Sequence, residues 1–143
     1  MNSAGGRLPR IAVVADDLMW ATRLLDLVRR ASAEPVAVRR ASDLEAALVG
    51  ADGVIVDTSA RAYDPLAVLR AARDAGLPSI AAAPHDDPAL RRAALDAGAG
   101  RVHPYRELHE RGDRVIGRWI ASIVIEPAAA AQPAAAVPGE AAT

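Results

Sequence analysis

The chain has 143 residues, of which 52% are hydrophobic, and this is enough for one domain with its own core. Its 17 Lys and Arg residues against 18 Asp and Glu residues leave a net charge of -1, which argues against a surface built for nucleic acid or anionic lipid. Cysteine is absent, which excludes disulfides, thiolate metal sites and a cysteine nucleophile.

Short β-branched runs alternate with helical patterns along the chain, which is typical of βα units and a mainly parallel sheet. The first half predicts a strand over 10–15, a helix over 18–32, a strand over 35–39, a helix over 43–49 and a strand over 53–57. Ser42, followed three residues later by Glu45, forms a capping box that predicts where the second helix begins. The run over 53–57 is nearly all apolar, as expected for a central strand buried on both faces.

The second half continues the same alternation. It predicts a helix over 65–75, a strand over 79–83, a helix over 88–97, a short strand over 101–103 and a last helix over 106–125. Pro65 suits the first turn of its helix, and Gly76 suits the end of that helix. The sequence therefore predicts an α/β, doubly wound domain with five strands and five helices.

We expect the folded domain to span residues 10–125, after a flexible N-terminus over residues 1–9. From residue 126 the composition changes to Ala, Pro, Gln and Gly, so residues 126–143 are predicted to form a disordered tail. Residues 1–10 hold no hydrophobic signal core, and the apolar stretches are shorter than a membrane span. We therefore expect a cytoplasmic protein with neither membrane nor nucleic acid as a partner.

Three aspartates follow two of the predicted strands: Asp16 and Asp17 close the first, and Asp57 closes the third. In an open parallel sheet these strands end at the same edge, so the carboxylates would converge on one pocket able to hold a divalent cation. Such a pocket suits phosphoryl chemistry. The alternative is that Asp16 and Asp17 cap the following helix and that Asp57 only ends a strand.

In this order and at these spacings, the chain resembles the receiver domains of bacterial two-component response regulators over residues 10–120. The resemblance rests on the Asp16-Asp17 pair, on Asp57 at the end of the third strand, on Asp64 seven positions later, and on the Asp96-Ala97-Gly98-Ala99-Gly100 turn before the fifth strand. It implies the flavodoxin-like sheet of that family, five strands in the order 2-1-3-4-5.

The resemblance also implies that Asp57 accepts a phosphoryl group from a histidine kinase or a phosphotransfer protein. Asp16, Asp17 and Asp57, with the backbone carbonyl of Ser59, would bind Mg²⁺, which prefers hard oxygen ligands and neutralises charge on the incoming group. The protein would then be an atypical single-domain response regulator that signals to a downstream protein. It would not be an enzyme of another class, because the sequence has no glycine-rich phosphate loop and no dinucleotide fingerprint.

Two positions depart from the family pattern. Ala83 stands where receivers place a Ser or Thr, and His103 stands before Pro104 where they place a Lys. With this placement the fifth-strand region is shorter than is usual in the family. The switch hydroxyl is missing and the cation is replaced by a weaker, pH-dependent one. These departures favour a second function, a phosphorylation-independent pseudo-receiver that acts as a protein-binding or scaffold module, whereas the retained acids favour the first.

The last predicted helix carries an apolar stripe at helical spacing. Its members are Val115, Ile116, Trp119, Ile120 and Ile123. One interpretation is core packing. The other is a face for the downstream protein or for a homodimer, because receivers use their fourth and fifth helices and last strand in this way.

Overall fold

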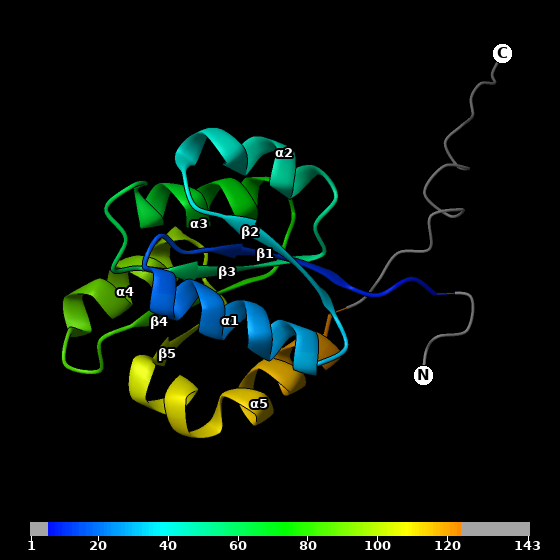
Figure 1. Ribbon diagram of the computed structural model, residues 1–143. Coiled ribbons are helices and arrows are strands. Elements are labelled where there is room, and N and C mark those ends of the chain that lie inside the picture. Colours follow the sequence, from blue (N-terminus) through cyan, green and yellow to red (C-terminus); the bar gives the residue numbers. More distant parts are fainter. Residues whose placement is uncertain (1–5, 124–143) are drawn as a thin grey trace, which may run out of the picture.

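A five-stranded, all-parallel sheet in the order β2-β1-β3-β4-β5 forms the centre of the protein (Figure 1). The strands of this computed structural model are β1 (Arg10–Val14), β2 (Glu34–Val38), β3 (Gly53–Asp57), β4 (Ser79–Ala83) and β5 (Arg101–Pro104). The structure describes residues 6–123. Residues 1–5 of the expected flexible N-terminus, the end of the predicted last helix at 124–125 and the expected tail over 126–143 lie outside the described residues.

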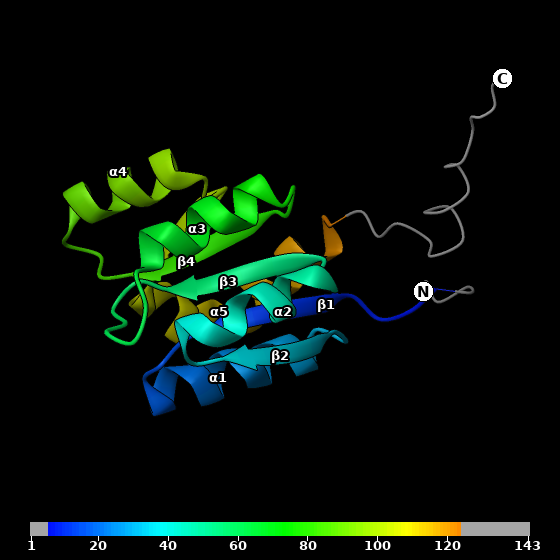
Figure 2. The same ribbon diagram turned by 90° about the horizontal axis from the view of Figure 1, so that it is seen from above.

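The helices cover both faces of the sheet, as the views in Figures 1 and 2 show. They are α1 (Leu18–Arg30), α2 (Leu44–Val49), α3 (Pro65–Asp74), α4 (Pro88–Ala97) and α5 (Tyr105–Ala121). Helices α1 and α5 pack on one face and α2, α3 and α4 on the other. The predicted doubly wound fold, its five helices and its strand order are thereby confirmed.

The apolar cores on the two faces are built by alternate residues of the strands, because successive side chains of a strand point to opposite faces. Val54 and Val56 of β3 belong to the cluster under α2, α3 and α4, whereas Ile55 belongs to the cluster under α1 and α5. All five residues of β3 are buried, as predicted for a central strand.

The capping box predicted at Ser42 and Glu45 is wrong. Residues Ala41–Asp43 form a short 3-10 helix that runs into α2, and no side chain caps the first turn of either segment. Ser42 lies inside the 3-10 turn, and the extended residue before the combined segment is Arg40, whose side chain forms no capping hydrogen bond. Helix α1 also ends earlier than predicted, at Arg30, because Ser32 takes a left-handed backbone conformation with φ 62°.

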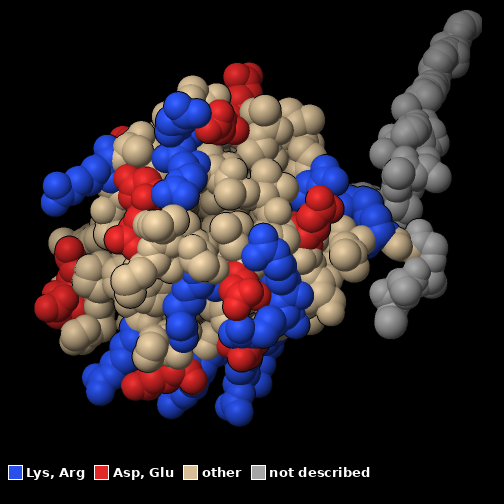
Figure 3. Space-filling model, viewed as in Figure 1, with Lys and Arg blue, Asp and Glu red and all other residues tan. Residues whose placement is uncertain are grey.

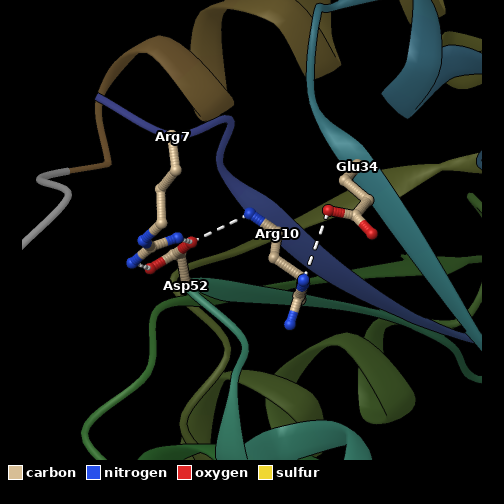
Figure 4. A network of polar contacts seen from close by, with 4 residues as sticks. All are labelled: Arg7, Arg10, Glu34 and Asp52. Carbon is tan, nitrogen blue, oxygen red and sulfur yellow. Dashed lines mark hydrogen bonds and ion pairs between the residues drawn. The ribbon is translucent and has the colours of Figure 1, made fainter. Parts of the chain in front are cut away.

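A polar network ties the amino ends of the strands together at the edge of the sheet opposite Asp57 (Figure 4). The guanidinium of Arg7 donates to both carboxylate oxygens of Asp52 at 2.7 and 2.9 Å, and the backbone N–H of Arg10 donates to Asp52 at 2.8 Å. Arg10 also pairs with Glu34 at 3.4 Å. Burial raises the pKa of Asp52, but the bonds from Arg7 and Arg10 outweigh it and hold that pKa below its usual range.

Between residues 6 and 123, none of the helices has the length and apolar character that a bilayer crossing requires.

Candidate functional site

The candidate site lies at the carboxyl edge of the sheet, around Asp57, the last residue of β3. Asp57 has no exposed surface. The chain beyond it stays attached to the sheet, because both the backbone N–H and the hydroxyl of Thr58 donate to the carbonyl of Ala82 in β4, at 3.0 and 2.8 Å. The backbone around Asp57 is therefore fixed on both sides of the residue.

One oxygen of the Asp57 carboxylate accepts three hydrogen bonds. The donors to Oδ1 are the backbone N–H of Ser59 at 3.1 Å, the hydroxyl of Ser59 at 3.0 Å and the hydroxyl of Tyr105. The second oxygen, Oδ2, is buried and has no partner among the described residues. Asp57 is thus held by protein donors on one oxygen and enclosed on the other.

Tyr105 reaches Asp57 because it begins α5, directly after β5 ends at Pro104. Its ring packs against Trp20 of α1, with ring centroids 4.8 Å apart and an interplanar angle of 42°. Burial and the hydrogen bond to Asp57 raise the pKa of Tyr105 to about 12. The phenol is therefore protonated at neutral pH and remains a hydrogen-bond donor to the carboxylate.

A second tyrosine fixes the backbone under the site. The hydroxyl of Tyr63, a buried residue, donates to the carbonyls of Val14 at 2.7 Å and of Asp57 at 2.9 Å. It thereby joins the ends of β1 and β3. Burial, followed by the nearby Asp57 charge, raises the pKa of Tyr63 well above its usual value, so this phenol also stays protonated.

The two acids that follow β1 are engaged elsewhere. Asp16 Oδ2 accepts from the backbone N–H groups of Arg61 and Ala62 at 2.8 and 2.7 Å. Burial raises the pKa of Asp16, but these two bonds outweigh it and the pKa lies below its usual value. Asp17 is the N-cap of α1, and its Oδ1 accepts from the backbone N–H of Trp20 at 2.9 Å.

The arrangement does not fit the Mg²⁺ site that the sequence predicted. Over residues 6–123, no group of three or more His, Cys, Asp and Glu side chains is placed to hold a metal ion. Asp16 holds the loop after β3 and Asp17 caps a helix. The backbone carbonyl of Ser59, the fourth predicted ligand, stays a prediction. The alternative of a structural role therefore describes Asp17, whose carboxylate caps α1.

His103, predicted to stand at the family's Lys position before Pro104, forms no hydrogen bond with Asp57 among the described residues. His103 lies within β5, where it pairs with Ala82 of β4, and its Nδ1 lies 2.9 Å from Glu107 Oε1. The side chain that contacts Asp57 is that of Tyr105, two residues later. The prediction gave the residue before Pro104 the place of the family's Lys, and this made the fifth-strand region shorter than is usual in the family. A fifth-strand region of the usual length, counted from the turn at Gly98, puts Tyr105 at the Lys position instead. The sequence therefore held a signal for Tyr105.

Ala83 ends β4 as predicted, and its side chain is buried in the apolar cluster on the α2, α3 and α4 face. It offers no hydroxyl to the site. The hydroxyls that donate to the Asp57 carboxylate are instead those of Ser59 and Tyr105. The Ser59 and Tyr105 donors around Asp57 thus serve the aspartate itself.

No family model matches the sequence, and no curated protein matches it. Solved structures do match. The DrrB receiver domain in its BeF3-activated form is 15% identical, with a TM-score of 0.70 over 80% of this chain and 99% of that one. A response regulator from Thermotoga maritima is 15% identical, with a TM-score of 0.68 over 81% of this chain and 100% of that one.

A further match carries a metal. The receiver domain of a sensor histidine kinase from Pseudomonas aeruginosa, described with a magnesium ion coordinated in its active site cleft, is 19% identical. Its TM-score is 0.68, over 81% of this chain and 100% of that chain. The chain has the receiver fold. The resemblance inferred from the sequence is confirmed at the level of fold, and the receiver fold places Asp57 at the end of its central strand.

Proposed function

We propose that this receiver-fold protein is a regulatory module that acts by binding another protein, and that it does so without phosphorylation of Asp57. The observation that carries the proposal is the closed state of Asp57. This carboxylate has no exposed surface, and three donors hold its Oδ1. This is the pseudo-receiver alternative that Ala83 and His103 favour, and the geometry of Asp57 supports it.

Phosphoryl transfer to a carboxylate needs an oxygen that approaches the phosphorus atom in line with the leaving group. Neither oxygen of Asp57 meets this need as it stands, because Oδ1 is shared among its donors and Oδ2 is enclosed. Reaching either oxygen requires Tyr105 to move away from Asp57 and to give up its contact with Trp20. Both contacts oppose that movement.

The charge around Asp57 also disfavours transfer. The negative charge of an incoming phosphoryl group has to be neutralised by a metal ion or a cation. The sequence contains no lysine at all, since all of its 17 basic residues are arginines. Among the described residues, Asp57 receives no hydrogen bond or ion pair from an arginine. Asp16 and Asp17 accept hydrogen bonds from backbone N–H groups.

The second candidate is the atypical response regulator, phosphorylated on Asp57 with Mg²⁺ by a histidine kinase or a phosphotransfer protein. The unpartnered Oδ2 of Asp57 is the observation in its favour, because a buried carboxylate oxygen without a donor is costly and would gain from a ligand. This function requires a rearrangement of Asp16, Asp17 and Tyr105. In both cases the proposed setting is the cytoplasm, and the proposed activity is binding rather than catalysis of another reaction.

The proposal is tested by comparing the proteins that co-purify with tagged wild type and with tagged Asp57→Asn from the same cells. Asparagine keeps the shape and the Oδ1 acceptor of Asp57 but takes no phosphoryl group. We expect the same partners at the same recovery for both forms. A partner recovered only with wild type, while Asp57→Asn unfolds at the same denaturant concentration, would favour the response regulator. Recovery of no partner with either form would contradict a binding module.

A further inference from the structure

We propose that a groove between β5 and α5 is a binding site for a small anionic ligand of the nucleotide class. The groove has a volume of about 580 Å³, within the range of roughly 300–1,000 Å³ typical of small-molecule sites. Four arginines line it above a floor that includes two buried polar residues, and we call this cavity the β5–α5 groove. The arginines are Arg101, Arg111, Arg114 and Arg118, and the floor residues are Ser79 and His103.

The groove exists because α5 does not follow the edge of the sheet. The end of α5 crosses toward the centre, where Trp119 and Ile123 lie so close to Gly53 of β3 that a Cβ there would meet them at 3.0 and 2.9 Å. Figure 2 shows α5 passing behind the middle of the sheet. Since β5 is the edge strand, this course leaves part of the face formed by β4 and β5 open to one side of α5.

Positive charge is concentrated in the β5–α5 groove although the chain as a whole carries a net charge of -1. Over residues 6–123, none of its four arginines forms an ion pair. Other arginines are paired, such as Arg106 with Glu110 and Arg30 with Asp113. Figure 3 shows such mixed charges on the α1 and α5 side of the molecule. One acid, Glu107, also lines the groove, and its Oε1 lies 2.9 Å from His103 Nδ1.

Like charges that share one cavity repel each other, and an anion relieves that repulsion. Guanidinium groups suit phosphate in particular, because their planar donors bind two of its oxygens at once. Several guanidinium groups around one cavity therefore favour a ligand with more than one negative charge. A di- or triphosphate has this property.

Two further features of the β5–α5 groove point to a ligand. The hydroxyl of Ser79, a residue only 2% exposed, is buried and has no hydrogen-bond partner in the part of the chain that the structure describes. A buried hydroxyl without a partner is unfavourable, and here it leaves an unused donor just beneath the lining of the groove. The half-buried Trp119 also lines the groove and offers an aromatic surface for a base. Phosphates on the arginines and a base against Trp119 together describe a nucleotide.

An acidic peptide is the competing ligand, and the properties of β5 favour it less than they favour a nucleotide. An extended peptide would bind by adding a strand to β5, the sheet edge. Strand β5 has only four residues and ends at Pro104, which lacks the N–H needed for further pairing. A compact ligand inside the cavity makes better use of these residues.

The test is a calorimetric titration of the full chain with ATP, with GTP and with inorganic pyrophosphate. The variants are Arg114→Ala and Arg118→Ala in the groove, and the control is Arg70→Ala, an exposed arginine of α3 that does not line the groove. We expect at least one nucleotide to bind wild type saturably and more tightly than pyrophosphate does. Its affinity should fall about tenfold in each groove variant. Its affinity for Arg70→Ala should equal that for wild type.

Each other outcome overturns the proposal. Absence of saturable binding by both nucleotides does so directly, and an equal loss in Arg70→Ala would reduce the effect to general charge attraction. Pyrophosphate binding as tight as that of the nucleotides would mean that the base, and with it Trp119, contributes nothing to the affinity. Binding of hexaglutamate in place of the nucleotides would assign the groove to an acidic peptide. Asp57→Asn is titrated in parallel and is expected to bind as wild type does, so the groove and the proposed function are tested separately.

Discussion

The hydroxyl of Tyr105 donates a hydrogen bond to the carboxylate of Asp57, joining the start of α5 to the end of β3. Because Tyr105 also packs against Trp20, the same side chain connects α1, α5 and the central strand. In a receiver fold this is the edge at which the sequence predicted a metal ion and a phosphoryl group. Here the Asp57 carboxylate at that edge is buried and hydrogen-bonded to groups of the protein itself.

Tyr105→Phe is expected to lower the free energy of unfolding by about 1–2 kcal/mol, because it removes one donor from a buried carboxylate while the ring keeps its packing. Urea unfolding followed by circular dichroism measures the change. Tyr63→Phe is the matched control, since it removes a buried hydroxyl that serves backbone carbonyls and not the carboxylate. An unchanged unfolding midpoint for Tyr105→Phe would mean that the bond to Asp57 is not formed in solution.

Mg²⁺ is expected to leave the fluorescence of Trp20 unchanged. Trp20 lies against Tyr105 and its backbone N–H is bound by Asp17, so a metal that drew Asp16, Asp17 and Asp57 together would disturb it. The titration is made in a Trp119→Phe background, because the chain has two tryptophans. A saturable change in the millimolar range that disappears on addition of chelator and in Asp57→Asn would contradict the structural role given to these acids.

Asp52 is expected to make the fold sensitive to acid. Its pKa is lowered in the folded state, so its stabilising effect is fully present above the unfolded value of about 3.9 and is lost as the pH falls through the lower folded value. At pH 7, Asp52→Asn should cost about 1 kcal/mol of unfolding free energy, and the difference from wild type should shrink toward pH 3.

The control for Asp52→Asn is Asp26→Asn, which removes an exposed carboxylate paired with Arg30 and should cost at most about 0.5 kcal/mol. Denaturant unfolding at several pH values measures both variants. A difference between wild type and Asp52→Asn that stays constant from pH 7 to pH 3 would contradict the lowered pKa. Asp16 shifts in the same direction, so some acid sensitivity should remain in Asp52→Asn.

Two glycines of α5 are expected to respond oppositely to alanine. A Cβ on Gly112 would lie 2.8 Å from a methyl group of the buried Leu27, so Gly112→Ala should destabilise the fold by about 1–3 kcal/mol. A Cβ on Gly117 would meet nothing within 4 Å, so Gly117→Ala should stabilise the helix by about 0.5–1 kcal/mol. Equal effects of the two substitutions on the thermal midpoint would contradict the packing of α5 against α1.

Much of the fold was predictable from local patterns. The apolar run of β3, Pro65 at the start of α3 and the glycines Gly76 and Gly98 after α3 and α4 each specify their structure through burial or backbone conformation, and the structure agrees with each. The failure at Ser42 has a physical reason. Ser42 can cap a helix only from an extended position before it, and here the chain already turns into a 3-10 helix at Ala41.

The candidate site was predicted in part. The sequence identified Asp57 as its centre and left a capping role open for Asp17, and the structure places both accordingly. The prediction missed Tyr105, although the shortened fifth-strand region was a signal that the residue facing Asp57 lies further along the chain; the register of β5 and the start of α5 bring Tyr105 to the carboxylate. The assumption that the family's Lys position lies directly before Pro104 led to His103, whose hydrogen-bond partner is Glu107.

The measurement that tests the central claim most directly is the intact mass of the protein after incubation with Mg²⁺ and phosphoramidate or acetyl phosphate, beside Asp57→Asn and a receiver domain that accepts phosphate from the same donor. With Asp57 enclosed and bound by Tyr105, we predict that the mass stays unchanged while the control receiver gains a phosphoryl group. A Mg²⁺-dependent gain of one phosphoryl group in wild type, absent in Asp57→Asn, would contradict the claim and establish a working response regulator.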